Sequence, residues 1–314
     1  MKKLAFILSL CALLISCGNK ALKDDCGCFL DYDEALTAAG KNKEPLLMVF
    51  TQDGEDISIS SKYTVFHADF SQNAYQKMSA PDEATTEQQA LANTYTTIMQ
   101  KNYQLAILLS VSQMPAAFLC TKEGYVVTAI EAVDYTDKSS LENKLNSYSS
   151  ELSRFNNLVA QTKKGSALDK VEAIDGLFMA TNQTYRTFLL PLVQTAIKLD
   201  KDNKTGHVGK FILAQAQAQA MFSYSQGDVE DAVKQYLTAA DNDFLKDEEK
   251  QECFYTAAYL VTASGSDDYE GIIEYMQTAY DLAPNSSKAP AIKDAIAYFE
   301  TVAEKSAEYD ESQE

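Results

Sequence analysis

Six cysteines and two histidines are the residues of this 314-residue chain that could carry redox, nucleophilic or metal chemistry. Two thiols are close in sequence only at Cys26-Gly27-Cys28. A disulfide there would close a very small ring, and strained disulfides are more easily reduced and more oxidising. The pair could therefore serve as a redox centre. We favour an inert or structural pair instead, because no supporting helix terminus is evident that would lower a thiol pKa.

The remaining thiols and imidazoles do not form a catalytic pattern. Cys120 lies in an apolar strand pattern and Cys253 in an apolar helical pattern, so both are expected to be small buried residues. His67 and His207 are far apart in the sequence and cannot form a helical ligand pair. His67 lies in a buried-looking strand, which favours a buried, hydrogen-bonded imidazole over a hydrolase base. We assign no catalytic residue, metal site or cofactor.

The charge balance excludes one class of partner. The formal net charge is −18, from 27 basic and 45 acidic side chains. Only Arg154 and Arg186 carry guanidinium groups, so the chain has few forked donors for phosphate. Nucleic acid is therefore not an expected partner. The chain is long enough for two folded domains.

The N-terminus has the pattern of an export signal. Two lysines precede an apolar run from Leu4 to Ile15, which is too short to span a bilayer permanently. The run is followed by Ser16-Cys17 and resembles a bacterial lipoprotein signal, which implies that Cys17 is acylated and becomes the mature N-terminus. An ordinary signal peptide that happens to end at a cysteine is the alternative. We expect a signal over residues 1–16 and a tether over 17–28.

Residues 29–148 have the pattern of an α/β unit. Leu46–Thr51 is a nearly continuous apolar run of strand length, which predicts a strand buried on both faces. A second strand pattern covers Tyr63–Phe70. The other expected elements are a helix from Asp33 stopped by Gly40, a helix over 85–109, a hairpin with strands over 116–120 and 125–129, and a helix from Ser139 onward.

This element order resembles a thioredoxin-like α/β sandwich. The residues with the spacing of that family's last core helix, cis-proline and terminal hairpin are Asn102, Leu105, Ala106, Leu109, Val111, Pro115 and Lys122–Val127. The resemblance covers about a third of the chain, and it implies a cis Met114–Pro115 bond beside which an extended peptide can pair with the backbone. Alternatively, Pro115 merely begins an edge strand.

The redox motif of that family is missing. Its Cys-x-x-Cys should follow Phe50-Thr51, where the chain reads Gln52-Asp53-Gly54 and contains no thiol up to Lys62. This segment is barely long enough for a parallel crossover, so most of the usual helix is also absent. We therefore expect the fold without thiol–disulfide exchange at the usual site.

The chain is helical after a linking helix over 149–165. Helices are expected over 166–182, 186–199, 208–226, 229–240, 247–264, 268–282 and 287–306. Gly227–Ala239 and Asp268–Asn285 resemble the turn and second helix of tetratricopeptide repeats, although Ile272 is larger than the small residue that family prefers. The resemblance implies a repeat domain over 166–310 with a curved docking surface.

Two glutamines are candidate lining residues of that surface. Gln215 and Gln219 share one face of their helix, and a solvated helix face is the alternative interpretation. The aromatic residues of these helices are expected in the core rather than on a ligand platform: Phe222, Tyr224, Tyr255 and Tyr259.

Taken together, the expected fold class is α/β plus all-α, a thioredoxin-like sandwich followed by a tetratricopeptide-like solenoid. The function we favour is non-enzymatic: a lipid-anchored envelope protein, facing the periplasm or the cell exterior, that binds or scaffolds a protein or peptide partner. The rival is an envelope thiol–disulfide oxidoreductase that uses Cys26 and Cys28.

Overall fold

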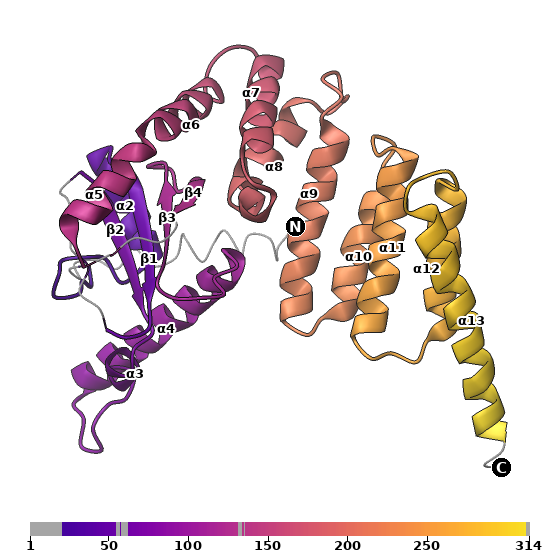
Figure 1. Cartoon of the computed structure of the whole chain (residues 1–314), viewed down its shortest axis with the longest axis horizontal. Coiled ribbons are helices and arrows are strands. Elements are labelled where there is room, and N and C mark those ends of the chain that lie inside the picture. Colours follow the sequence, from indigo (N-terminus) through magenta and orange to yellow (C-terminus); the bar gives the residue numbers. More distant parts are fainter. Residues whose placement is uncertain (1–20, 55–56, 58–61, 131–133, 135, 312–314) are drawn as a thin grey trace. The chain divides into compact units, whose positions relative to one another are not determined.

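The computed structural model describes residues 21–54, 57, 62–130, 134 and 136–311 (Figure 1). The expected signal at 1–16 lies outside these residues. Contacts divide the chain into two compact units, which we describe separately. The first runs up to Lys164 and also includes Ala173–Leu189, and the second comprises Gly165–Glu172 and the chain from Leu190 onward.

The first unit contains a four-stranded mixed sheet with the order β2-β1-β3-β4. Strand β1 (Leu46–Thr51) pairs in parallel with β2 (Thr64–Asp69) and antiparallel with β3 (Ala116–Cys120), which pairs antiparallel with β4 (Val126–Ile130). All six residues of β1 are buried, which confirms the strand predicted to be covered on both faces. Because β3 lies between β1 and β4, Pro115 precedes an interior strand, and the edge-strand alternative is wrong.

Helices α2 (Tyr32–Asn42) and α4 (Thr86–Leu108) cover one face of this sheet. Side chains alternate across a strand, so Leu46, Met48 and Phe50 share the face that packs against these helices. The ring of Phe50 meets two other core rings edge-on, that of Phe66 at 5.8 Å and that of Phe118 at 5.9 Å. The short helix α3 (Gln72–Gln76), which the sequence did not predict, follows β2.

Helix α2 does not stop at Gly40. It continues to Asn42 and ends at Lys43, which has a left-handed φ of 61° and donates its N–H to the carbonyl of Ala39. A glycine in the last turn of a helix lowers helix stability only by the backbone entropy that it loses, so Gly40 does not stop the helix. The left-handed cap at Lys43 decides where the helix ends.

Residues 21–30 fold against β2, where we expected a tether up to residue 28. The Phe29 N–H donates to the Val65 carbonyl at 2.9 Å, and the His67 N–H donates to the Phe29 carbonyl at 2.9 Å. Lys23 forms an antiparallel bridge with Phe29. Since β2 is the last strand on its side of the sheet, this loop satisfies backbone groups that would otherwise be exposed at an edge.

The boundary between the two units does not lie at the residue that the sequence suggested. Helices α5 (Lys138–Ser147) and α6 (Ser149–Gln161) follow β4. We expected the repeats to begin at residue 166, yet residues 173–189 belong to the first unit. They comprise the later part of α7 (Ala167–Ala180) and the 3₁₀ helix η1 (Gln183–Leu189), whose Tyr185 ring lies 5.8 Å from the Phe118 ring.

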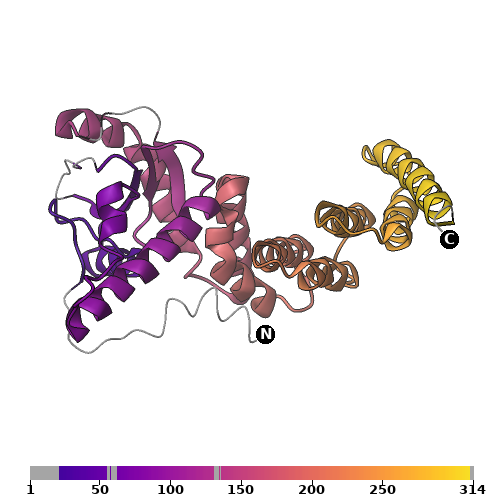
Figure 2. The same cartoon turned by 90° about the horizontal axis from the view of Figure 1, so that it is seen from below.

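The second unit is helical. Its helices are α8 (Leu190–Leu199), α9 (Val208–Ser225), α10 (Val229–Ala240), α11 (Asp247–Ala263), α12 (Tyr269–Leu282) and α13 (Ala289–Glu311). Each packs against the next in the chain, and Figures 1 and 2 show α9 to α13 side by side. The helix predicted over 186–199 is divided, because Pro191 lacks an N–H and is tolerated in a first helical turn but not farther along.

Small side chains allow these helices to approach closely. Ala216 and Ala220 of α9 pack against Ala232 and Ala239 of α10, and all four are buried. Ile272 of α12 is fully buried in the next cluster, so the large residue at this position fills the core rather than separating the helices. None of the described helices is long and apolar enough to span a bilayer.

Candidate functional site: a groove at the carboxyl end of β1

A groove of about 330 Å³ lies where β1 and β2 end. In open sheets with parallel strands, ligands commonly bind beyond the carboxyl ends of those strands, where the chain turns away and leaves space. The groove is lined by Gln52, Phe70, Tyr75, Tyr103, Ala106, Ile107, Val111 and Met114.

The walls of this groove are apolar and exposed. Tyr103 is 60% exposed, Ile107 57% and Tyr75 47%. Tyr103 and Ile107 are four residues apart on α4 and therefore lie on one face of that helix. The Phe70 ring lies edge-on to that of Tyr103, with centroids 6.5 Å apart. Large apolar side chains gathered in one exposed place are typical of a contact surface.

The Met114–Pro115 turn forms one end of the groove. The bond between these residues is cis, as the family resemblance implies. Met114 lines the groove, and the pairing of β3 with β1 ends at Ala116 opposite Phe50. Within the described parts of the chain, the Met114 backbone has no hydrogen-bond partner. Its amide and carbonyl are therefore the backbone groups beside the groove with which an extended peptide could pair.

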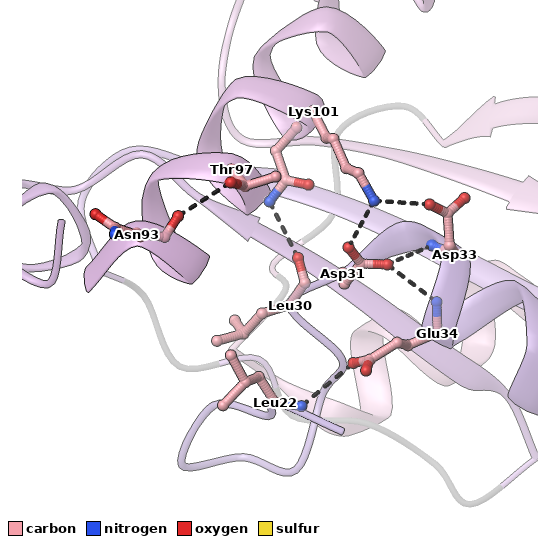
Figure 3. Close-up of polar contacts among 9 residues, drawn as sticks. Leu22, Leu30, Asp31, Asp33, Glu34, Asn93, Thr97 and Lys101 are labelled. Carbon is pink, nitrogen blue, oxygen red and sulfur yellow. Dashed lines mark hydrogen bonds and ion pairs between the residues drawn. The ribbon is translucent and has the colours of Figure 1, made fainter. Parts of the chain in front are cut away.

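An ionic cluster fixes the helix that carries the groove wall (Figure 3). The Lys101 ammonium lies 3.2 Å from an Asp31 carboxylate oxygen and 2.9 Å from an Asp33 carboxylate oxygen. Asp31 also caps α2 by accepting from the Asp33 and Glu34 N–H groups. Burial opposes the charge on Lys101, but the two carboxylates hold its pKa above the usual value.

The next residue in the helix completes this attachment. The Asn102 side-chain amide donates to the Leu30 carbonyl at 3.1 Å. Each residue of a helix turns about 100° from the last, so Lys101 and Asn102 can hold α4 against the start of α2 while Tyr103 reaches the groove. Of the groove residues, Met114 was singled out from the sequence as a candidate contact residue; for Tyr103 and Ile107 the available signal was their i, i+4 spacing on α4.

The segment expected to carry the redox motif supplies a wall residue instead of a thiol. Gln52 lines the groove, and Gly54 has a positive φ of 69°. Ile57 is buried. The described residues between Gln52 and Lys62 form no helix and include no cysteine.

Cys26 and Cys28 lie in the loop beside β2, away from the groove lining. Cys26 is exposed and Cys28 is buried, and no disulfide joins the cysteines that the structure describes. Burial, together with the nearby Asp24 carboxylate, raises the pKa of the Cys28 thiol well above its usual value. Since the thiolate is the reactive form, this placement weighs against a redox role.

The two other described cysteines are buried, and His207 contacts a carboxylate. Cys120 and Cys253 are buried, which confirms the prediction, and burial raises the pKa of Cys253 to about 12. His207 contacts a Glu172 carboxylate oxygen through Nε2 at 3.1 Å. Across the described ranges, no three His, Cys, Asp or Glu side chains are placed to hold a metal ion.

His67 links the loop to the sheet through a buried hydrogen-bond chain. Its Nε2 lies 2.9 Å from the Thr51 hydroxyl, and its Nδ1 lies 2.7 Å from an Asp24 carboxylate oxygen. This confirms the buried, hydrogen-bonded imidazole expected from the sequence. A hydroxyl, imidazole and carboxylate in this order can activate a nucleophile. Thr51 is only 1% exposed, however, so the chain of groups is closed to a substrate and acts as a structural connection.

We expect Asp24→Asn to lower the free energy of unfolding by about 1 kcal/mol at pH 7. Burial raises the pKa of Asp24, but hydrogen bonds from His67 and the Cys28 N–H outweigh it, so the net shift is downward. The stabilisation is therefore complete above the unfolded-state pKa of about 3.9 and is lost as the pH falls through the lower folded-state pKa.

Urea unfolding of both proteins between pH 7 and about pH 2.5 checks this expectation. The difference between wild type and Asp24→Asn should shrink below about pH 4. Asp25→Asn is the matched control, because Asp25 is an exposed neighbour. A constant difference across the whole pH range would contradict the assignment.

The candidate residues on the helices of the second unit differ in their exposure to solvent. Gln215 and Gln219 are half-buried on α9, so neither is a freely solvated side chain. Phe222 and Tyr255 are half-buried. Tyr224 and Tyr259 are exposed, so their expected core positions are wrong: the small alanines fill the spaces between helices and leave these rings outside. Cys17, the expected lipid-attachment residue, lies outside the described residues.

Sequence comparisons match part of this chain to a protein family and part of it to a relative. Residues 207–305 match a family described as "Uncharacterised protein C-terminal domain". A protein of Treponema pallidum (strain Nichols), named "Uncharacterized protein", is 25% identical over 138 residues, which are 44% of this chain. The match covers 45% of that relative, so the chain spans less than half of its length. Neither description names an activity, a ligand or a partner.

Proposed function

We propose that this chain is a lipid-anchored protein of the bacterial cell envelope that binds a protein or peptide partner by contact. In this proposal residues 29–148 form a thioredoxin-like domain without its dithiol, and the later helices form a tetratricopeptide-like scaffold. The observation that carries the proposal is the exposed apolar groove beside the Met114–Pro115 turn.

The sheet supports the thioredoxin-like part of the proposal. Two parallel strands at one side and an antiparallel hairpin at the other give the order β2-β1-β3-β4, with the cis bond immediately before β3. The helical packing of α9 to α13, with alanines at the close approaches, supports the repeat part. The lipid anchor rests on the sequence pattern that ends at Cys17.

The partner we propose for the groove is an extended, apolar and uncharged or basic segment. Aromatic and aliphatic walls favour apolar side chains, and the Met114 backbone can pair with an extended strand. The net charge of −18 disfavours acidic partners and steers basic ones toward the protein.

Tyr103→Ala combined with Ile107→Ala is expected to weaken binding of an extended Leu/Lys-alternating peptide at least about tenfold. Both side chains are more than half exposed, so their removal should not unfold the protein. Fluorescence anisotropy with the labelled peptide and the full chain measures the change. Leu91→Ala is the control, since Leu91 is exposed on the same helix and does not line the groove. Equal binding by the double variant and the control would refute the proposed groove function.

Insulin-disulfide reduction distinguishes the binding proposal from the oxidoreductase alternative. We expect no turnover, because the described lining of the groove contains no thiol and the Cys28 thiol is buried with a raised pKa. Clear turnover that is abolished in the Cys26→Ser, Cys28→Ser variant would establish the alternative.

A further inference from the structure

A second cavity, of about 470 Å³, lies at the other end of β1. Pro45, which immediately precedes β1, forms part of its lining. The cavity is shared by three segments of the first unit: the end of α2, the turn between β3 and β4, and the end of α6. It is separate from the groove, because the described lining residues of the two do not overlap.

The charge of this cavity is opposite to that of the whole chain. Among the described residues that line it, the ionisable ones are four lysines and one carboxylate: Lys43, Lys122, Lys163, Lys164 and Glu123. The chain as a whole has a net charge of −18. Lysines from three separate segments therefore meet in this cavity, although acidic side chains outnumber basic ones in the chain as a whole.

The carboxylate in the cavity neutralises only part of this charge. Glu123 contacts the Lys163 ammonium at 2.9 Å and the Lys122 ammonium at 3.8 Å. Lys43 and Lys164 make no ion pair with any described residue. Glu44, next to Lys43 in the sequence, accepts from the Thr64 hydroxyl at 2.9 Å and does not line the cavity. The ammonium groups of Lys43 and Lys164 thus have no described carboxylate as a partner, whereas those of Lys122 and Lys163 share Glu123.

The lining also indicates the kind of anion that fits. Ammonium groups are compact point charges that can contact phosphate oxygens from several directions. The volume exceeds that of an inorganic ion and lies within the range of small-molecule sites. Val159 and Ala160 add apolar atoms to the lining, and Asn156 adds an amide that can bond a hydroxyl group.

We propose that this cavity binds a small phosphate ester, with Lys43 and Lys164 as its main charge partners. The phosphate contacts these two ammonium groups, and the organic part of the ester contacts Val159 and Ala160. The chemistry is shared by a soluble glycerol phosphate and by the headgroup of a glycerophospholipid.

Isothermal titration calorimetry of the full chain in a nonionic detergent tests this site. One arm titrates glycerol 3-phosphate, and the other titrates mixed micelles that contain phosphatidylglycerol, with phosphatidylcholine micelles as the lipid control. We expect saturable binding in at least one arm that weakens as the ionic strength rises, because added salt screens exposed charges. Binding in the first arm identifies a soluble ester as the source, and binding in the second identifies a lipid headgroup.

Variants locate the binding within the molecule. Lys43→Gln with Lys164→Gln is expected to weaken binding at least about tenfold, because two charge contacts to phosphate are removed. Lys41→Gln with Lys293→Gln makes the same change in net charge at exposed positions outside the cavity and should leave the affinity within about twofold. Absence of binding in both arms up to about 10 mM probe, or equal weakening by the two double variants, overturns the proposal.

Discussion

Phe118→Ala is expected to lower the free energy of unfolding of the first unit by about 4 kcal/mol. Phe118 is buried in the interior strand β3, where its ring meets Phe50 on β1 and Tyr185 on η1. Truncation removes the buried ring and leaves a cavity that the sheet cannot close, because β1 and β4 hold β3 on both sides.

The same change should also loosen η1. Urea unfolding followed by circular dichroism measures the loss of stability, and limited proteolysis within Gln183–Leu189 measures the release of η1. Tyr103→Ala is the control: it removes an aromatic ring from the same unit, but one that is mostly exposed, and should change stability by no more than about 0.5 kcal/mol. A loss below about 1 kcal/mol for Phe118→Ala, or unchanged proteolysis of η1, would show that this contact does not hold η1 on the sheet.

Gly209→Ala should lower the free energy of unfolding of the second unit by about 3 kcal/mol, although alanine is normally the better helix former. Gly209 lies in the first turn of α9, against the backbone between α10 and α11. A Cβ at this position would lie 2.9 Å from the Phe244 carbonyl carbon and closer still to its oxygen. Because the neighbour is backbone, either α9 or that connection must move.

Gly176→Ala provides the matched control for this substitution. Gly176 is also helical, but its added Cβ would have Leu158 Cδ2 as the nearest atom at 3.9 Å, which is an ordinary contact. This variant should stabilise the protein by about 0.5–1 kcal/mol through helix propensity alone. Thermal or urea midpoints of the two variants should therefore move in opposite directions. A shift of the same sign and size in both would contradict the close approach at Gly209.

The elements of both units were largely predictable, because local patterns determine them. The apolar run Leu46–Thr51 coincides with β1, and the helices α9 to α12 lie within one residue of their expected bounds. Asp228 and Asp268 mark helix starts because each carboxylate accepts from a backbone N–H three residues later. Gly227 has a positive φ of 76°, as expected for a residue between helices.

The candidate groove was predictable in part. The turn at Met114–Pro115 could be located from its spacing to the preceding helix and the following hairpin. The apolar walls of the groove could not be located from the sequence, because a helical pattern does not distinguish an exposed aromatic residue such as Tyr103 from a buried one. The walls depend on how Lys101 and Asn102 orient α4, and those contacts join residues about 70 positions apart.

What the amino-acid sequence determined by itself is the identity and length of most elements, the absence of a thiol after β1 and the strongly acidic charge. Those properties follow from periodicity, caps and composition, which act over a few residues. Only the tertiary structure decided that residues 173–189 join the sheet unit, that the loop over 21–30 covers β2, and that lysines from three segments meet in one cavity. Such contacts depend on which exposed edges and apolar faces remain to be covered once the elements have formed, and that is a property of the packed chain rather than of any local pattern.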